Sequence, residues 1–151
     1  MSALAEPTAV YPLLLGVGLR TANPALGRSV AVHACRPLLV VASGAAMRRA
    51  LSRRVARARP PSSAWLVEPK GYSLPSRHTT VAALTVGACV RSMTLRGSPR
   101  WLASAVAAVA VGTSRVWLGV HWPSDVLAGW PFAEAWLRLT DATCPISSGR
   151  A

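Results

Sequence analysis

The sequence SRVWLGVHWPSD, residues 114–125, joins two apolar segments near the end of a chain of 151 residues. Ser114 and Arg115 lie at the end of the first apolar segment, and His121 and Asp125 stand four residues apart in the connection that follows. A carboxylate at this spacing can fix the tautomer of an imidazole, so that the other ring nitrogen is left to face a substrate. The stretch therefore predicts two helices joined by a turn that carries a reactive histidine.

Five apolar segments approach the roughly 17 to 25 residues that a bilayer-crossing helix needs. They cover residues 8–19, 30–47, 79–95, 101–118 and 126–139. Their charges lie mostly near the ends, as with Arg91 and Arg115, where a long side chain can reach the membrane interface. The predicted fold class is therefore all-α: a compact integral-membrane helical bundle with four to five hydrophobic helices, in a single domain over 1–151. The pair Arg36-Pro37 interrupts the second segment, so the number of spans stays open.

The composition favours a membrane setting and an anionic partner. Hydrophobic residues make up 52% of the chain and charged residues 15%, the formal charge is +12 and the mean hydropathy is +0.35. So few charges would cover a soluble domain poorly, since about a quarter of the residues of such domains are charged. Lys70 is the only lysine, and the planar fork of arginine suits phosphate as well as lipid headgroups. We therefore expect a multi-pass integral protein of a bacterial cell membrane.

Residues far apart in the sequence are predicted to meet at one face of the bundle. If the segments 79–95 and 101–118 form a hairpin, Ser76 and Ser114 emerge on the same side. The strongly basic connection 48–77 reaches that side too. The residues expected to converge there are Arg59, Ser76, Arg77, His78, Ser114, Arg115, His121 and Asp125.

These residue types suit a phosphatase that works without a metal ion. Such an enzyme needs cationic groups for the phosphoryl oxygens, a nucleophile, a carboxylate that orients the nucleophile, and an acid for the leaving oxygen. His121 with Asp125 offers the nucleophile and its carboxylate, and His78 is a second imidazole, available as the acid. Positive charge is available from Arg59, Arg115, Arg77 and Lys70. The three cysteines have no metal-ligand spacing, so neither a metal site nor a cofactor is expected.

At this point the spacing resembles the type-2 phosphatidic acid phosphatase superfamily, the membrane lipid phosphatases. Ser114-Arg115, His121 and Asp125 fit the family's SRxxxxxHxxxD motif without a gap. The tetrapeptide at 75–78, PSRH, resembles the PSGH motif, and Arg59-Pro60 resembles the end of the KxxxxxxRP motif. All three occur in the order that the family has.

The resemblance implies a role for each motif residue. His121 would be the nucleophile that forms a phosphohistidine, Asp125 its orienting partner, and His78 the general acid that protonates the leaving alkoxide. The substrate-binding residues would be Arg59, Arg115, Ser76, Arg77, Ser114, Lys70 and Arg53. The implied substrate is a phosphomonoester or pyrophosphate of a lipid, with polyprenyl-linked phosphates among the candidates. The implied partners are this lipid phosphate and the surrounding membrane lipids.

Two positions depart from the family's pattern. The lysine expected seven residues before Arg59 is Ser52. Arg53 and Arg54 adjoin it, and either could substitute with a shift of about 100° around a helix. The usual glycine of the second motif is Arg77, and if that glycine serves close approach of the backbone to phosphate, an arginine alters the pocket. Both departures bear on rate and substrate choice more than on reaction class.

Other functions stay open on the sequence alone. The alternative raised by the two departures is a catalytically impaired member that acts as an anionic-lipid-binding or scaffold membrane protein. A nucleic-acid-binding protein would fit the pI near 11.7, but lysine-rich and aromatic-interleaved recognition stretches are absent. A vanadium haloperoxidase would share the oxyanion site, but those proteins are soluble and much longer. The side of the membrane is undecided, because the positive-inside rule favours a cytoplasmic site and the resemblance an outward-facing one.

Overall fold

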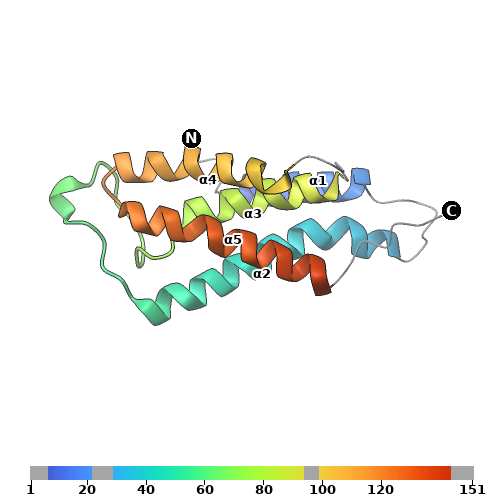
Figure 1. The fold of residues 1–151 in the computed structure, drawn as a ribbon, viewed down its shortest axis with the longest axis horizontal. Helices are drawn as coiled ribbons and strands as arrows, with labels where there is room; N and C mark the ends of the chain where they lie inside the picture. Colours follow the sequence, from blue (N-terminus) through green and yellow to red (C-terminus); the bar gives the residue numbers. More distant parts are fainter. Residues whose placement is uncertain (1–6, 22–28, 94–98, 144–151) are drawn as a thin grey trace.

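Five α-helices make up most of the residues that the structure, a computed structural model, describes: 7–21, 29–93 and 99–143 (Figure 1). They are α1 (Pro7–Thr21), α2 (Ser29–Val55), α3 (Arg77–Ser92), α4 (Arg100–Trp117) and α5 (Pro123–Thr143), with a short 3-10 turn, η3 (Ser62–Ala64), after α2. No strand occurs in these ranges, so the predicted all-α class is confirmed. Among the same residues, no helix unites the length and the apolar content needed to span a lipid bilayer.

Helix α3 is the centre of the bundle, since it packs against all four other helices. Figure 1 shows the helices running side by side along the long axis, with the connection between α2 and α3 looping out beyond one end. The buried apolar side chains at the core include Leu14, Val41, Leu84, Ala108 and Leu137. The predicted turn between α3 and α4 lies largely outside the described residues.

Small residues set how closely the helices approach one another. A Cβ atom added at Gly87 would overlap Leu137 on α5, and one added at Gly112 would overlap Val126 on the same helix. Ser104 lies on α4 about two turns before Gly112 and is also fully buried; a Cβ atom added at Gly87 would lie 3.4 Å from its Cβ atom. Close packing of this kind holds α3, α4 and α5 in a fixed register, which matters because all three carry residues of the candidate site.

Helix α2 extends further than its apolar segment, because it begins at Ser29 and continues through Pro37 to Val55. The basic stretch that was expected to be a connection is therefore partly helical. Arginine has a high helix propensity, which agrees with this extension. The helix ends where Ala56 takes a positive φ of 49° and its N–H donates to the carbonyl oxygen of Ser52 at 3.0 Å.

A buried ion-pair network ties the helices together at the end of the bundle away from residues 114–125. Arg91 on α3 donates from Nη2 to Glu134 at 2.8 Å and from Nε to Asp141 at 2.9 Å, both on α5. Arg36 on α2 also reaches Asp141, at 3.3 Å. The expectation that Arg91 extends to a membrane interface is therefore wrong, because paired carboxylates on the neighbouring helix keep its guanidinium inside. Arg115 is buried as well, and it faces a cleft rather than an interface.

Candidate active site

The turn that presents His121 is built by the end of helix α4. Gly119 has a φ of +69°, and its N–H donates to the carbonyl oxygen of Val116 at 2.9 Å, while Val120 donates to that of Arg115 at 3.3 Å. This pair of bonds is the Schellman arrangement, which ends a helix with a left-handed residue and favours glycine there. A Cβ atom at Gly119 would also overlap the carbonyl oxygen of Ala64. The glycine thus reverses the chain between the two ends of the third motif.

His121 and Asp125 face each other directly. The Nδ1 atom of His121 lies 3.3 Å from Oδ2 of Asp125, and both side chains are buried. On the other side of the ring, Nη1 of Arg59 lies 3.3 Å from Nε2. A guanidinium can only donate, so Nε2 accepts and the ring proton resides on Nδ1, where it is donated to Asp125. In this tautomer Nε2 carries the lone pair that a nucleophile requires; it accepts from Arg59, and His121 lines a cleft.

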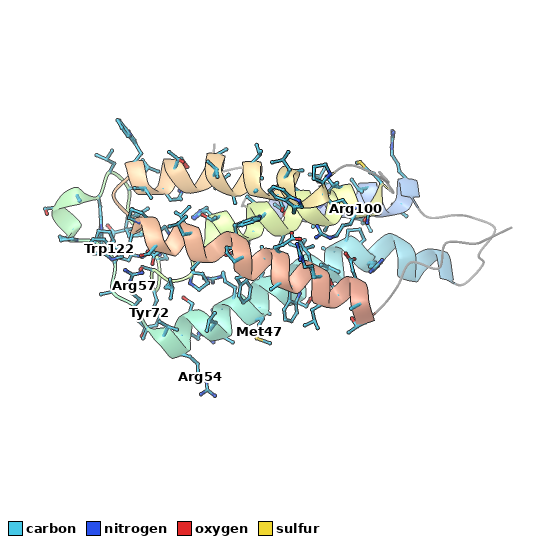
Figure 2. All side chains as sticks on the ribbon, in the orientation of Figure 1. Met47, Arg54, Arg57, Tyr72, Arg100 and Trp122 are labelled. Carbon is cyan, nitrogen blue, oxygen red and sulfur yellow. The ribbon has the colours of Figure 1, made fainter. Side chains whose placement is uncertain are left out.

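Asp125 is held by three further donors. Arg57 donates from Nη1 to Oδ1 at 2.9 Å, Ser73 donates from Oγ to Oδ2 at 2.8 Å, and the backbone N–H of Trp122 donates to Oδ2 at 2.9 Å. Arg57 also lies over the ring of Trp122, with Cζ 5.9 Å from the ring centroid (labelled in Figure 2). Four donors on one buried carboxylate fix its orientation, and through it the orientation of the imidazole.

Sequence reasoning missed Arg57 and Ser73. Arg57 is one of six arginines between residues 48 and 59, and nothing in its local spacing distinguishes it from the others. Ser73 lies in a turn-prone stretch and belongs to none of the three motifs. Their partner, Asp125, is 68 and 52 residues away in the sequence, so no periodic pattern could have linked them.

Arg59 is fixed in place by carbonyl oxygens of the surrounding loops. Its Nε donates to Gly71 at 2.9 Å, and Nη2 donates to Lys70 at 2.9 Å and to Tyr72 at 3.2 Å. Its Nη1 donates to Val120 at 2.6 Å. These neutral acceptors orient the guanidinium without neutralising it, so its charge stays available to an anion beside Nε2 of His121.

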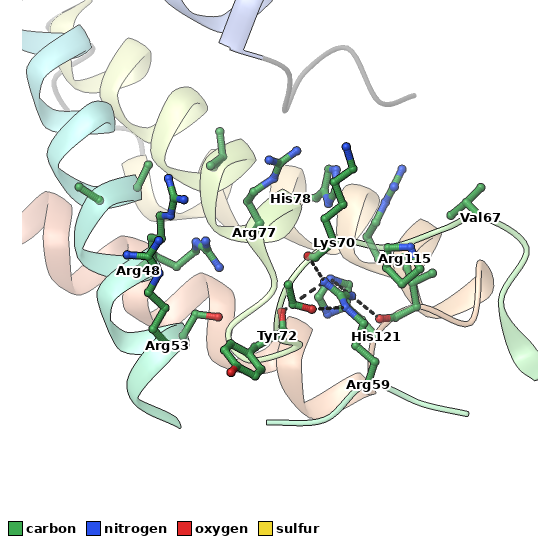
Figure 3. Close-up of a pocket in the computed structure, with 18 of the residues that line it drawn as sticks. Arg48, Arg53, Arg59, Val67, Lys70, Tyr72, Arg77, His78, Arg115 and His121 are labelled. Carbon is green, nitrogen blue, oxygen red and sulfur yellow. Dashed lines mark hydrogen bonds between the residues drawn. The ribbon is translucent and has the colours of Figure 1, made fainter. Parts of the chain in front are cut away.

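A cleft of about 1060 Å³ opens on His121 and Arg59 (Figure 3). Seven of the predicted site residues line it: Arg53, Arg59, Lys70, Arg77, His78, Arg115 and His121. The structure thus brings both imidazoles and several guanidinium groups to one opening. The Nδ1 atom of His78 is buried and has no hydrogen-bond partner among the described residues. Within those residues, no cluster of histidine, cysteine and acidic side chains is arranged to hold a metal ion.

Three predicted site residues do not line the cleft. Asp125 lies behind His121. The hydroxyl of Ser76 caps helix α3, because its Oγ accepts from the backbone N–H of Thr79 at 3.5 Å and from the Thr79 hydroxyl at 3.1 Å. The hydroxyl of Ser114 donates to the carbonyl oxygen of Val111 at 2.6 Å within α4. In the structure, the hydroxyls of Ser76 and Ser114 therefore engage their own helices.

The surroundings of His121 favour its neutral form. Burial lowers the pKa of its imidazole from the ordinary 6.5 to about 4, and the charge of Arg59 acts in the same direction. The hydrogen bond to Asp125, the charge of that carboxylate and a hydrogen bond with the backbone of Ser73 oppose the shift. Burial also lowers the pKa of Arg59. The charge of Asp125 opposes this shift, and the charge of Arg77 adds to it. A neutral imidazole at physiological pH has the lone pair that nucleophilic attack needs.

Comparison with known proteins adds independent findings. A model of the PAP2 superfamily matches residues 29–143. The undecaprenyl-diphosphatase of Sulfolobus acidocaldarius is 44% identical over 70 residues, and the match spans 44% of this chain but only 32% of that relative's length. A crystal structure of a transmembrane PAP2 type phosphatidylglycerolphosphate phosphatase from Bacillus subtilis superposes with a TM-score of 0.71 at 25% identity, over 97% of this chain and 75% of that chain.

Proposed function

Because the chain belongs to the PAP2 superfamily, we propose that it is a phosphatase that hydrolyses a phosphomonoester or diphosphate of a lipid. The observation that carries this proposal is the state of His121. Its Nδ1 is engaged by buried Asp125 at 3.3 Å, while its Nε2 faces Arg59 at the same distance and borders the cleft. A nucleophile, the group that orients it and a cation for the phosphoryl oxygens therefore adjoin in one place.

The reaction proposed for these residues has two steps. Nε2 of His121 attacks phosphorus and forms a P–N bond, while the bond to the leaving oxygen breaks and His78 gives that oxygen a proton. The product is a phosphohistidine and a free lipid alcohol or lipid monophosphate. His78 then takes a proton from water, whose oxygen attacks phosphorus, and the P–N bond breaks to release inorganic phosphate and restore His121.

Cationic side chains of the cleft would bind the phosphoryl group. Arg59 and Arg115 are proposed to hold its equatorial oxygens. Donors that are already oriented stabilise the negative charge of the transition state most strongly. Arg77, Lys70 and Arg53 line the same cleft and are proposed to attract the anionic substrate. The three side chains that do not line the cleft, Asp125, Ser76 and Ser114, would act by positioning the imidazole and the helix ends.

A membrane location is supported by the outer surface of the bundle. Large apolar side chains point away from the core on several helices, including Trp117 on α4, 82% exposed, and Leu127 on α5, 73% exposed. Surfaces of this kind on a monomer indicate contact with lipid or with another protein. Together with the likeness to a transmembrane phosphatase, they support a multi-pass membrane protein acting on an amphiphilic substrate. A bacterial cell membrane stays a prediction.

Release of inorganic phosphate by the purified protein in detergent tests this function. The substrates are phosphatidate, phosphatidylglycerol phosphate and undecaprenyl diphosphate, each with and without EDTA, and His121→Ala is the control. We expect turnover of at least one substrate that persists in EDTA and is lost in His121→Ala. Turnover abolished by EDTA would contradict metal independence. No turnover of any substrate would favour the alternative of an impaired, lipid-binding family member.

A further inference from the structure

The reaction proposed above assigns no role to one buried cation of the cleft, Arg48. Arg48 lies on helix α2 and lines the cleft, yet only 9% of its surface is exposed. Its Nη1 donates to the carbonyl oxygen of Pro75 at 3.2 Å. Its Nε is buried without a hydrogen-bond partner in the part of the chain that the structure describes. None of the ion pairs found there, to a limit of 4.0 Å, involves Arg48.

A buried guanidinium without a counter-charge is costly, because desolvation of a cation is offset only by an anion or by a full set of acceptors. A buried cation of this kind that lines a cleft marks a candidate binding site, where a ligand supplies the missing charge. Arg48 lines the cleft, so we assign the missing anion to the molecule that occupies the cleft.

The position of Arg48 in the cleft distinguishes it from Arg59. On helix α2, the cleft wall is apolar at Val41, Ala42, Ala45 and Ala46, and it becomes cationic at Arg48. Figure 3 draws Arg77 between Arg48 and the group formed by His78, Arg115 and His121. Arg77 is close enough to lower the pKa of Arg59 through its charge. Arg48 thus lies where the apolar wall meets the cationic end of the cleft.

We propose that Arg48 is the centre of a second anion subsite, which binds the phosphate that is not transferred in a diphosphate substrate. The proposal rests on the proposed function and narrows it to lipids with two phosphates in series. The terminal phosphate would face Nε2 of His121, the second phosphate would be bound by Arg48, and the lipid would continue along the apolar wall of α2.

Substrate preference of Arg48→Gln tests the subsite. The two substrates share one lipid, undecaprenyl diphosphate and undecaprenyl monophosphate, and kcat/KM is measured for each. Loss of a charge-assisted contact is expected to lower kcat/KM for the diphosphate about 10- to 100-fold while the monophosphate changes little. Arg48→Lys is expected to recover part of the loss. Arg54→Gln, an exposed position on the same helix that does not line the cleft, is the matched control.

The binding of ligands that are not hydrolysed tests the subsite independently of the proposed function. Wild-type protein and Arg48→Gln are heated in detergent with methylenediphosphonate, which is not hydrolysed, or with inorganic phosphate. We expect methylenediphosphonate to raise the melting temperature of the wild type more than phosphate does, and Arg48→Gln to lose that difference. If Arg48→Gln lowers kcat/KM equally for both substrates, or for neither, the second subsite is wrong. It is also wrong if Arg48→Gln keeps the difference in melting temperature between the two ligands. If the wild type hydrolyses neither undecaprenyl substrate, the thermal comparison still decides the subsite, and turnover of phosphatidate or phosphatidylglycerol phosphate decides the function.

Discussion

Arg57 and Asp125 form an ion pair across 68 residues of sequence, with Nη1 2.9 Å from Oδ1. The pair fixes the carboxylate whose other oxygen receives the proton of His121. Removing Arg57 therefore should disturb the imidazole without removing any group that touches substrate. We expect Arg57→Met to lower kcat roughly 10- to 100-fold with little change in KM, because a small misplacement of the nucleophile slows the chemical step.

A matched variant distinguishes this positioning role from loss of charge at the surface. Arg54→Met removes an arginine from the exposed end of helix α2, and it should leave kcat unchanged. Arg57→Lys should recover part of the activity. An Arg57→Met protein in which KM rises while kcat stays constant would contradict the role in positioning and indicate contact with substrate.

Asp125→Asn should have a larger effect than the loss of Arg57. The amide can donate to Nδ1 of His121, which would move the ring proton to Nε2 and remove the nucleophilic lone pair. A wrong tautomer of this kind lowers kcat by about 10⁴-fold in a hydrolase whose histidine is oriented by an aspartate, and we expect a loss of similar order here. Ser73→Ala removes one of the other donors to the carboxylate and should cost far less. Equal losses in the two variants would contradict the tautomer argument.

The pKa of His121 should respond in opposite directions to its two charged neighbours. Arg59 lowers this pKa and Asp125 raises it, so Arg59→Gln should raise the value and Asp125→Asn should lower it further. Titration of ¹³C-labelled histidine by NMR in detergent measures both, with the resonance assigned by its absence in His121→Gln. In the wild type we expect a midpoint near 4. Shifts of the same sign in both variants would contradict the arrangement.

The lowered pKa of His121 also predicts how the free energy of unfolding depends on pH. The folded protein binds a proton at His121 only near pH 4, whereas the unfolded chain does so near its ordinary value of 6.5. Between these two values the unfolded state binds more protons, so the free energy of unfolding falls as the pH falls from 6.5 toward 4. His121→Gln should weaken this dependence when denaturation midpoints are compared at pH 7 and pH 5. An unchanged dependence would indicate that His121 is not buried as a neutral ring.

Gly119→Ala should destabilise the protein for two reasons. The residue has a φ of +69°, and an added Cβ would overlap Ala64. Gly71→Ala is the matched comparison, because its φ is +71° but the space around it is open. We expect a loss in the free energy of unfolding of about 1 kcal/mol for Gly71→Ala, from the backbone alone, and a larger loss for Gly119→Ala. Equal losses would mean that the contact with Ala64 relaxes easily.

The ion pair between Arg91 and Glu134 should matter more than the neighbouring pair with Arg138. Both partners of the first pair are buried, and breaking a buried pair costs about 3–5 kcal/mol, so Arg91→Met should be strongly destabilised. Arg138 is 70% exposed in its side chain, and Arg138→Met should cost about 1 kcal/mol or less. Replacing Arg91 and Glu134 together by apolar residues should recover much of the loss. Failure of the double variant to recover would locate the effect in packing.

The fold was predictable where the sequence is periodic and apolar. Each of the five predicted apolar segments corresponds to one helix, and the family resemblance drawn from the three motifs is confirmed. The extent of α2 was not predictable, because arginine fits both a helix and a basic connection. The burial of Arg91 was missed for a different reason. Its partner Glu134 lies on another helix, and a single sequence does not show which charges will meet.

The candidate site was predictable only in its motif residues. His78, Arg59 and His121 lie at recognisable spacings, and the structure brings all three to one cleft. Arg57 could not be predicted, because its role depends on a contact across the bundle. Arg48 could not be singled out either. It lies in a run of arginines with similar local sequence, and only its burial in the structure distinguishes it from the others.

During turnover, His121 should become covalently phosphorylated. The direct measurement is to mix the protein with lipid substrate carrying ³²P in the terminal phosphate, quench in alkaline detergent, which preserves phosphohistidine, and locate the label by peptide mass spectrometry. We predict label on His121, discharged by acid and absent from His121→Ala. Label on another residue, or phosphate release by His121→Ala at the rate of the wild type, would contradict the account.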